Sequence, residues 1–244
     1  MRIEELKGFD TSGLVRQSLT CDNDLQNIPP PLPASDGSHF ALIISGKPRS
    51  GKSTLALGLL TSKGKNRVYR GRFNNIITFI PKHSLSSLKK NPFEKLAPEK
   101  VFNELTTDNL EKAYEMVKAN AENGETTLIF LDDMASSLKQ SMKTQELFNK
   151  ICFNRRHLKT SIMFLVQTFK AIPINCRKTA SHIILFKNHN KLENTAVFEE
   201  ILFLERKIVD LLFKYVYDAP HQFLYLDVNS GTLHKNFNPL VIKE

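Results

Sequence analysis

The stretch that decides the fold covers residues 40–54 and reads Phe-Ala-Leu-Ile-Ile-Ser-Gly-Lys-Pro-Arg-Ser-Gly-Lys-Ser-Thr. Its first five residues form an uninterrupted apolar run, which is typical of a buried parallel strand. Residues 46–53 fit the phosphate-loop pattern G-x-x-x-x-G-K-[ST], and a helix is expected over residues 52–60. Because the pattern lies at a strand–helix junction, the sequence predicts a P-loop that binds a nucleotide.

The chemistry of this loop assigns a role to several of its side chains. Its glycines let backbone N–H groups surround a phosphate, and the helix that follows adds its dipole. We expect Lys52 to bridge the β- and γ-phosphates of ATP, Ser53 to bind Mg²⁺ and Thr54 to lie beside the α-phosphate. Lys47 and Arg49 are extra cations for phosphate or for a neighbouring subunit. The predicted nucleotide-binding residues are Gly46, Lys47, Pro48, Arg49, Ser50, Gly51, Lys52, Ser53 and Thr54.

Outward from this loop, apolar strands alternate with helices. Further strands are predicted over residues 75–80, 128–131, 161–166 and 183–186, and further helices over residues 108–120, 144–156 and 201–217. Residues 223–227 and 231–235 alternate around a turn and predict a hairpin. Residues 82–107 carry no assignment. The fold class is therefore α/β, a P-loop NTPase with a mainly parallel central sheet flanked by helices and a C-terminal β-hairpin.

The chain divides into two unequal parts. Residues 1–36 are interpreted as an N-terminal extended arm, because the proline-rich run 28–33 favours polyproline conformation. Residues 37–244 contain no internal repeat and no second core, so they are interpreted as one P-loop ATPase domain.

Two adjacent carboxylates follow the strand predicted over residues 128–131. We expect that strand to lie next to the P-loop strand, where Asp132 would hold Mg²⁺ through water. Asp133 is the candidate general base that polarises the attacking water. The alternative is that the two carboxylates only cap a helix.

An amide and several arginines complete the candidate site. Gln167 ends the strand predicted over residues 161–166 and would face the γ-phosphate as a sensor that positions water, the alternative being a polar strand end. Ring ATPases need an arginine that reaches a neighbour's γ-phosphate. Arg156 is the first candidate for this arginine finger, followed by Arg155 and Arg177, although cations at a helix end are also favoured by its dipole.

Charge is unevenly distributed along the chain. The 244 residues (27.8 kDa) carry a net charge of +9, yet residues 37–93 contain eleven Lys or Arg and no acid, and residues 147–192 contain nine and no acid. Such segments favour a positive face toward a polyanion. The candidate contacts for such a polyanion are Lys63, Lys65, Arg67, Arg70, Arg72, Lys187 and Lys191. The alternative is that residues 63–72 form a solvated loop.

Composition also excludes several classes of protein. No apolar run approaches the roughly 18 residues of a transmembrane helix, so we expect no membrane insertion. Three scattered cysteines, at positions 21, 152 and 176, fit neither a zinc site nor a disulfide framework and favour a reducing compartment.

With these motifs in view, the chain resembles the poxvirus-type genome-packaging ATPases of eukaryotic double-stranded DNA viruses, within the FtsK/HerA superfamily of P-loop NTPases. The resemblance rests on the P-loop, on Leu131-Asp132-Asp133, and above all on the run 154–162 continuing to Gln167-Thr168. It covers roughly residues 40–240. One departure is that the superfamily pattern has Glu after the Walker B aspartate, whereas this chain has Asp133.

The resemblance implies Lys52 and Ser53 at phosphate and Mg²⁺, Asp132 on Mg²⁺, Asp133 as base and Gln167 as sensor. It further implies a ring of six or five subunits that pumps DNA into a preformed capsid, with a capsid or portal-vertex protein as partner. A virion or a viral factory in the reducing cytoplasm of the host cell would be its location.

We therefore expect a Mg²⁺-ATP-driven translocase that packages viral double-stranded DNA. The alternatives are a nucleoside or nucleotide kinase, which would ignore DNA, and a non-viral FtsK/HerA-like DNA translocase. A third alternative, a nucleotide-dependent adaptor, would keep its activity after Asp133→Asn or Gln167→Ala.

Overall fold

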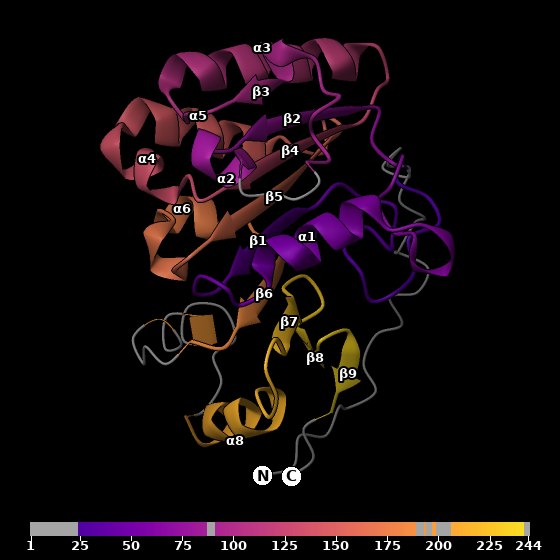
Figure 1. Ribbon diagram of the computed structural model, residues 1–244, viewed down its shortest axis with the longest axis vertical. Helices are drawn as coiled ribbons and strands as arrows, with labels where there is room; N and C mark the ends of the chain where they lie inside the picture. Colours follow the sequence, from indigo (N-terminus) through magenta and orange to yellow (C-terminus); the bar gives the residue numbers. More distant parts are fainter. Residues whose placement is uncertain (1–23, 87–90, 189–192, 194–196, 199–205, 242–244) are drawn as a thin grey trace, which may run out of the picture.

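The structure is a computed structural model that describes residues 24–86, 91–188, 193, 197–198 and 206–241. Its described strands form one nine-stranded sheet in the order β3-β2-β4-β5-β1-β6-β7-β8-β9 (Figure 1). The first six of these are parallel and the last three antiparallel. The predicted α/β class, with a mainly parallel sheet and a C-terminal hairpin, is confirmed.

The strands match the apolar runs of the sequence closely. Their bounds are β1 Ala41–Ser45, β2 Asn75–Phe79, β3 Val101–Phe102, β4 Thr127–Asp132, β5 Thr160–Val166, β6 His182–Phe186, β7 Phe223–Asp227, β8 Thr232–Lys235 and β9 Asn238–Leu240. Every residue of β1, β5 and β6 is buried, as expected for strands covered on both faces. The short strands β3 and β9 were not predicted from the sequence, since they have too few residues to show a pattern.

The described helices pack against both faces of the sheet. Their bounds are α1 Lys52–Thr61, α2 Lys82–Ser86, α3 Thr107–Glu122, α4 Ala135–Gln140, α5 Met142–Phe153, α6 Ile174–Arg177 and α8 Arg206–Val216. Side-chain caps start two of them: Thr106 accepts a hydrogen bond from Asn109 N–H at α3, and Ser141 accepts one from Thr144 N–H at α5. Of the helix predicted over residues 201–217, residues 201–205 lie outside the described part of the chain.

Alternation along β1 divides the core in two. Ala41 and Ile43 face the cluster formed with α3, α5 and α8, whereas Leu42 and Ile44 face α1. The helix α1 therefore lies on one face of the sheet, and the P-loop joins the end of β1 to Lys52, its first residue. This connection fixes the P-loop at the carboxyl edge of the parallel strands.

The described part of the N-terminal region differs from the predicted extended arm. Residues 30–36 form consecutive turns, with Leu32 N–H bonded to the Pro29 carbonyl and Ser35 N–H to the Leu32 carbonyl. Leu25, Ile28 and Leu32 are buried in the core on the α1 face. The polyproline interpretation is therefore wrong for residues 28–33, because burial of their apolar side chains favours a folded path. Residues 1–23 lie outside the described residues.

A second difference concerns the order of the strands. The sequence predicts that the strand of Asp132 neighbours the P-loop strand, but β5 pairs with β1 on one side and with β4 on the other. The strand that ends at Gln167 thus lies between the P-loop and the acidic pair. Parallel strand order depends on how the helical crossovers pack, and no local pattern encodes it.

Candidate active site

The P-loop is held in a tight curve by its own backbone. Ser50 N–H donates to the Lys47 carbonyl, Gly46 N–H donates to the Val166 carbonyl of β5, and Gly51 starts α1 with a φ of 109°. A Cβ atom on Gly46 would lie 2.7 Å from both Phe186 Cβ and Ser50 Oγ. Glycine at position 46 is therefore required by close approach, and glycine at position 51 by its backbone conformation.

Lys52 is buried at the base of this loop. Its Nζ donates to the carbonyl oxygens of Gly46 at 2.6 Å and of Lys47 at 3.1 Å. Burial lowers the pKa of its ammonium group, while the carboxylates of Asp132 and Asp133 raise it. The Lys52 ammonium group is thus held beneath the P-loop and beside Asp132 and Asp133, where it could bind a phosphate.

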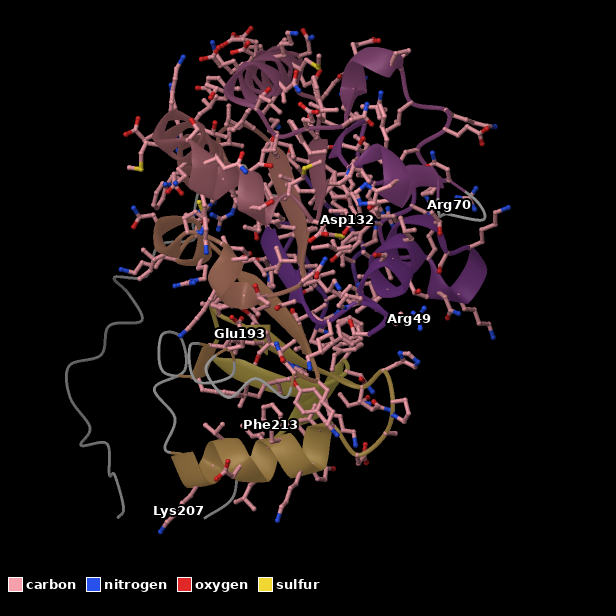
Figure 2. All side chains as sticks on the ribbon, turned by 60° about the vertical axis from the view of Figure 1, so that its left-hand side comes forward. Arg49, Arg70, Asp132, Glu193, Lys207 and Phe213 are labelled. Carbon is pink, nitrogen blue, oxygen red and sulfur yellow. The ribbon has the colours of Figure 1, made fainter. Side chains whose placement is uncertain are left out.

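The loop also contains an unused polar group. Within the described residues, the hydroxyl of Ser50 is buried without a hydrogen-bond partner. Buried polar groups normally form hydrogen bonds, so a buried hydroxyl without a partner at this position fits a site where a phosphate oxygen would be that partner. The tip of the loop, Lys47 to Arg49, is exposed, and Figure 2 labels Arg49. Arg49 has a φ of 64°.

Asp132 ends β4 at the carboxyl edge of the sheet, and Asp133 follows it directly. The pKa of Asp132 is raised to about 6, mainly by burial and in part by the nearby Asp133 carboxylate, while Lys52 opposes the shift. A half-buried carboxylate with too little positive charge nearby is stabilised by a cation. Mg²⁺ is usually held by one or two carboxylates together with substrate phosphates, so Asp132 and the Ser53 hydroxyl fit such a site.

Gln167 and Asp133 are brought together although they lie on different strands. Gln167 Nε2 donates a hydrogen bond of 2.7 Å to Asp133 Oδ2, and Asp133 N–H donates to the Leu165 carbonyl of β5. Asp133 adopts a φ of 56°, a left-handed conformation that aspartate tolerates better than most residues. Both side chains are exposed at the carboxyl edge, where water has access to them.

The candidate arginines do not join this cluster. The helix α5 ends at Phe153, and Arg155 and Arg156 occupy the turn that leads into the amino end of β5. The strand β5 has seven residues, which corresponds to about 20 Å between its two ends. Neither arginine therefore reaches the P-loop of its own chain, so a finger from this turn would have to act on another subunit.

Among the three arginines, Arg156 is the most exposed. Arg155 donates to the His39 and Cys152 carbonyls of its own chain. Arg177 donates to the Ile172 carbonyl, and its guanidinium lies 5.3 Å from the centre of the Phe169 ring. These contacts give Arg155 and Arg177 structural roles that the sequence alone did not show.

The candidate DNA-contacting residues lie at two different edges. Lys63, Lys65, Arg67 and Arg70 are exposed on the loop after α1, named here the cationic loop (residues 63–70), whose Arg70 is labelled in Figure 2. Arg72 instead donates to the Asn27 carbonyl, and Lys187, at the carboxyl edge, donates to the Tyr217 carbonyl. Lys191 lies outside the described residues.

Residues from the C-terminal part of the chain that lie beside the P-loop were not predicted from the sequence. His221 Nδ1 lies 3.0 Å from the Ser50 carbonyl oxygen, and Phe186 and Phe223 lie on the same side of the loop. No spacing rule links residue 221 to residue 50. The only local signal was the proline at position 220, which marks a turn.

Two features of the described residues lie outside the candidate site. Cys152 and Cys176 are buried free thiols, and burial raises the pKa of each to about 12. No helix within the described ranges is long and apolar enough to cross a bilayer.

Solved structures share this fold at low sequence identity. The genome packaging NTPase B204 from Sulfolobus turreted icosahedral virus 2, in complex with ATP-gammaS, is 17% identical, with a TM-score of 0.58 over 82% of this chain and 98% of that chain. B204 from Sulfolobus turreted icosahedral virus, described as its DNA-packaging ATPase, is also 17% identical, with a TM-score of 0.59 over 82% and 97% of the two chains. ATPases 2 and 3 of EssC from Geobacillus thermodenitrificans are 12% identical, with a TM-score of 0.55 over 84% of this chain and 40% of that one.

The sequence itself matches a family. No curated protein matches the chain, but the profile of the poxvirus A32 protein family matches residues 36–216 of its 244 residues. That match includes the P-loop, the acidic pair and Gln167. The chain therefore belongs to the poxvirus A32 protein family and is an ATPase with the P-loop fold.

Proposed function

We propose that this chain is the Mg²⁺-ATP-driven motor that moves double-stranded viral DNA into a preformed capsid. Membership of the poxvirus A32 family supports a viral genome-packaging ATPase of the FtsK/HerA type. The observation that carries the proposal is the hydrogen bond between Gln167 and Asp133, beside the P-loop and open to solvent. An amide and a carboxylate held together at this position suit the activation of an attacking water. The family match favours hydrolysis over transfer of phosphate to an organic acceptor.

In the proposed reaction each residue has a separate task. Lys52 neutralises charge on the β- and γ-phosphates, and the backbone N–H groups of the P-loop orient them. Ser53 and Asp132 would hold Mg²⁺, which supplies charge neutralisation at the phosphates. Asp133 accepts the proton of the attacking water, and Gln167 fixes both the Asp133 carboxylate and the direction of attack.

The coupling to DNA is proposed for the cationic loop. Its four exposed side chains form none of the ion pairs identified among the described residues. It follows α1, which begins at the P-loop, so a movement of the loop around the nucleotide would be transmitted along one helix. Contacts of this type go to phosphates, ignore base sequence and weaken with salt.

The test is the rate of ATP hydrolysis by the purified chain, with and without long double-stranded DNA, at about 50 mM and about 200 mM salt. We expect Mg²⁺-dependent turnover that DNA stimulates several-fold at the lower salt. Lys52→Ala should abolish it, and Asp133→Asn should bind ATP yet hydrolyse it roughly 100-fold more slowly or worse. The matched control is Asp108→Asn, an exposed acid on α3.

A combined variant tests the DNA contacts. Replacing Lys63, Lys65, Arg67 and Arg70 by Gln should keep the basal rate, remove the stimulation and lower the salt dependence by about one unit of slope per lost phosphate contact. Lys112→Gln on α3 is the control. Normal hydrolysis by Asp133→Asn would refute the base assignment, and turnover that DNA never affects would refute the motor.

A further inference from the structure

A hollow of about 430 Å³ lies beside the P-loop. One wall comes from the P-loop and the first turn of α1, and the other from the end of β6 and the segment that enters β7. Its lining includes Arg49, Thr54, Leu55, Phe186, His221 and Phe223. The volume lies within the range of small-molecule sites.

The position of this hollow relative to the catalytic pair indicates which part of a nucleotide it would meet. Asp133 and Gln167 follow β4 and β5, on one side of β1, whereas Phe186 ends β6 on the other side. The γ-phosphate must lie toward the catalytic pair. Thr54, which we expect beside the α-phosphate, lines the hollow, so the opposite end of the nucleotide leaves the loop there.

We propose that this hollow binds the base of the nucleotide and that His221 selects adenine over guanine. This inference rests on the proposed function, because it takes ATP as the substrate. The chemistry of the walls suits a flat aromatic ligand. The ring centroids of Phe186 and Phe223 lie 5.4 Å apart with the rings tilted by 54°, so the two rings pack on each other and form one aromatic wall. Leu55 adds apolar surface, and Arg49 contributes a planar cation that can stack on a base.

His221 supplies the polar discrimination. Its Nδ1 lies 3.0 Å from the carbonyl oxygen of Ser50, and since a carbonyl only accepts, Nδ1 must carry the proton. In the neutral ring Nε2 is then an acceptor. An acceptor on this wall pairs with the 6-amino group of adenine and opposes the 6-oxo group of guanine.

The backbone of His221 supports a specific role. Its φ is 63°, in the left-handed region that non-glycine residues rarely adopt, and the bond to Ser50 holds it there. The same bond joins the C-terminal part of the chain to the P-loop. Base recognition would therefore be built partly by a segment 171 residues from Ser50 in sequence.

The experiment is calorimetric titration of the full chain with ATP-gammaS, GTP-gammaS and tripolyphosphate, all with Mg²⁺. We expect ATP-gammaS to bind roughly tenfold more tightly than GTP-gammaS, as one well-placed hydrogen bond allows, and tripolyphosphate to bind more weakly than both. His221→Asn, which tolerates a positive φ, should bring the two nucleotides to within about twofold of each other and leave tripolyphosphate binding unchanged. The control is His157→Asn, an exposed histidine at the amino edge of the sheet.

A second variant guards against a local folding defect at position 221. Phe223→Leu should weaken both nucleotides, but not tripolyphosphate, because it removes one of the stacking rings. If both nucleotides bind equally well and neither variant changes this, the inference is wrong while the proposed function stands. If the wild-type chain binds neither nucleotide nor tripolyphosphate, the proposed function fails and the inference fails with it.

Discussion

At the scale of single residues, backbone conformation carries much of the site. Gly51, Arg49 and Asp133 all have positive φ values, and all three lie at the carboxyl edge beside the expected phosphates. Such conformations cost free energy and persist where surrounding contacts enforce them. Asp133 is held by its N–H bond to the Leu165 carbonyl and by the bond from Gln167. These two hydrogen bonds fix the geometry of the candidate catalytic pair, Asp133 and Gln167.

Substitution of Gly46 tests whether the close approach at this position requires glycine. Gly46→Ala should lower the free energy of unfolding by about 1–3 kcal/mol, because the new Cβ would meet Phe186 Cβ and Ser50 Oγ at 2.7 Å. It should also weaken ATP binding, since Gly46 N–H and its carbonyl hold the loop and Lys52. Urea unfolding and nucleotide titration measure the two effects.

The matched control for this change lies within α1. A Cβ on Gly58 meets no described atom within 4 Å, so Gly58→Ala should stabilise the protein by about 0.5–1 kcal/mol through helix propensity. Equal stabilities for the two variants would contradict the close approach at Gly46.

At the scale of elements, the segment 24–36 joins parts of the chain that are far apart in sequence. Tyr69 and Tyr225 donate hydrogen bonds from their hydroxyls to the Pro33 and Pro31 carbonyls, and Asp24 pairs with Lys159 and His39. The proton of Tyr225 is used in its bond to Pro31. His182 Nδ1, 3.0 Å from the Tyr225 oxygen, must therefore donate to it.

This arrangement predicts a pH dependence of stability. Burial lowers the pKa of His182 from 6.5 to about 4, a shift that Arg155 reinforces and that Asp227 and Asp36 oppose. The unfolded chain therefore binds more protons between these values, so the free energy of unfolding should fall as the pH drops from about 6.5 toward 4. The loss can reach about 3 kcal/mol, since each pKa unit corresponds to about 1.4 kcal/mol.

Unfolding of wild type and His182→Gln in urea, from neutral pH to about pH 4.5, measures this contribution. The variant should be less stable at pH 7 yet lose less stability on acidification. His157→Gln, on an exposed side chain, should follow the wild-type curve. Parallel curves for wild type and His182→Gln would assign the acid sensitivity to other groups.

At the scale of the whole molecule, the candidate site residues and the candidate arginine finger lie at opposite edges of the sheet. The carboxyl edge holds the P-loop, Asp132, Asp133 and Gln167, whereas the turn with Arg156 lies at the amino edge of β5. Because one chain cannot bring these edges together, Arg156 can act as a finger only on a neighbour. In the proposed ring, that contact would be heterologous and would repeat around the axis.

Mixing of variants tests this arrangement. Lys52→Ala and Arg156→Ala should each abolish turnover in the assembled ring, but their equal mixture should recover up to about one quarter of wild-type activity by random assortment of neighbours. Arg155→Ala is the control, because its contacts to the His39 and Cys152 carbonyls are internal and a neighbour cannot replace them. Full activity of Arg156→Ala would move the finger elsewhere, and no recovery on mixing would contradict action between subunits.

Much of the fold could be predicted because buried parallel strands carry their own signal. The runs around Leu42, Ile129 and Phe164 are apolar throughout, and each is flanked by residues that favour a turn or a helix start. The edge strand β3 and the helix α4 were missed because short elements near the surface depend on their neighbours more than on periodicity.

The sequence by itself determined the family motifs and predicted which side chains form the candidate site. The P-loop, Asp132, Asp133 and Gln167 are recognisable because phosphate and Mg²⁺ chemistry demands particular side chains at strand ends, and such spacing is local. Only the tertiary structure decided that β5 separates β4 from β1, that Arg155 is tied to its own chain and that His221 meets Ser50. The physical reason is that these contacts join residues far apart along the chain. They depend on how whole strands and helices pack, and no local pattern of residues records that packing.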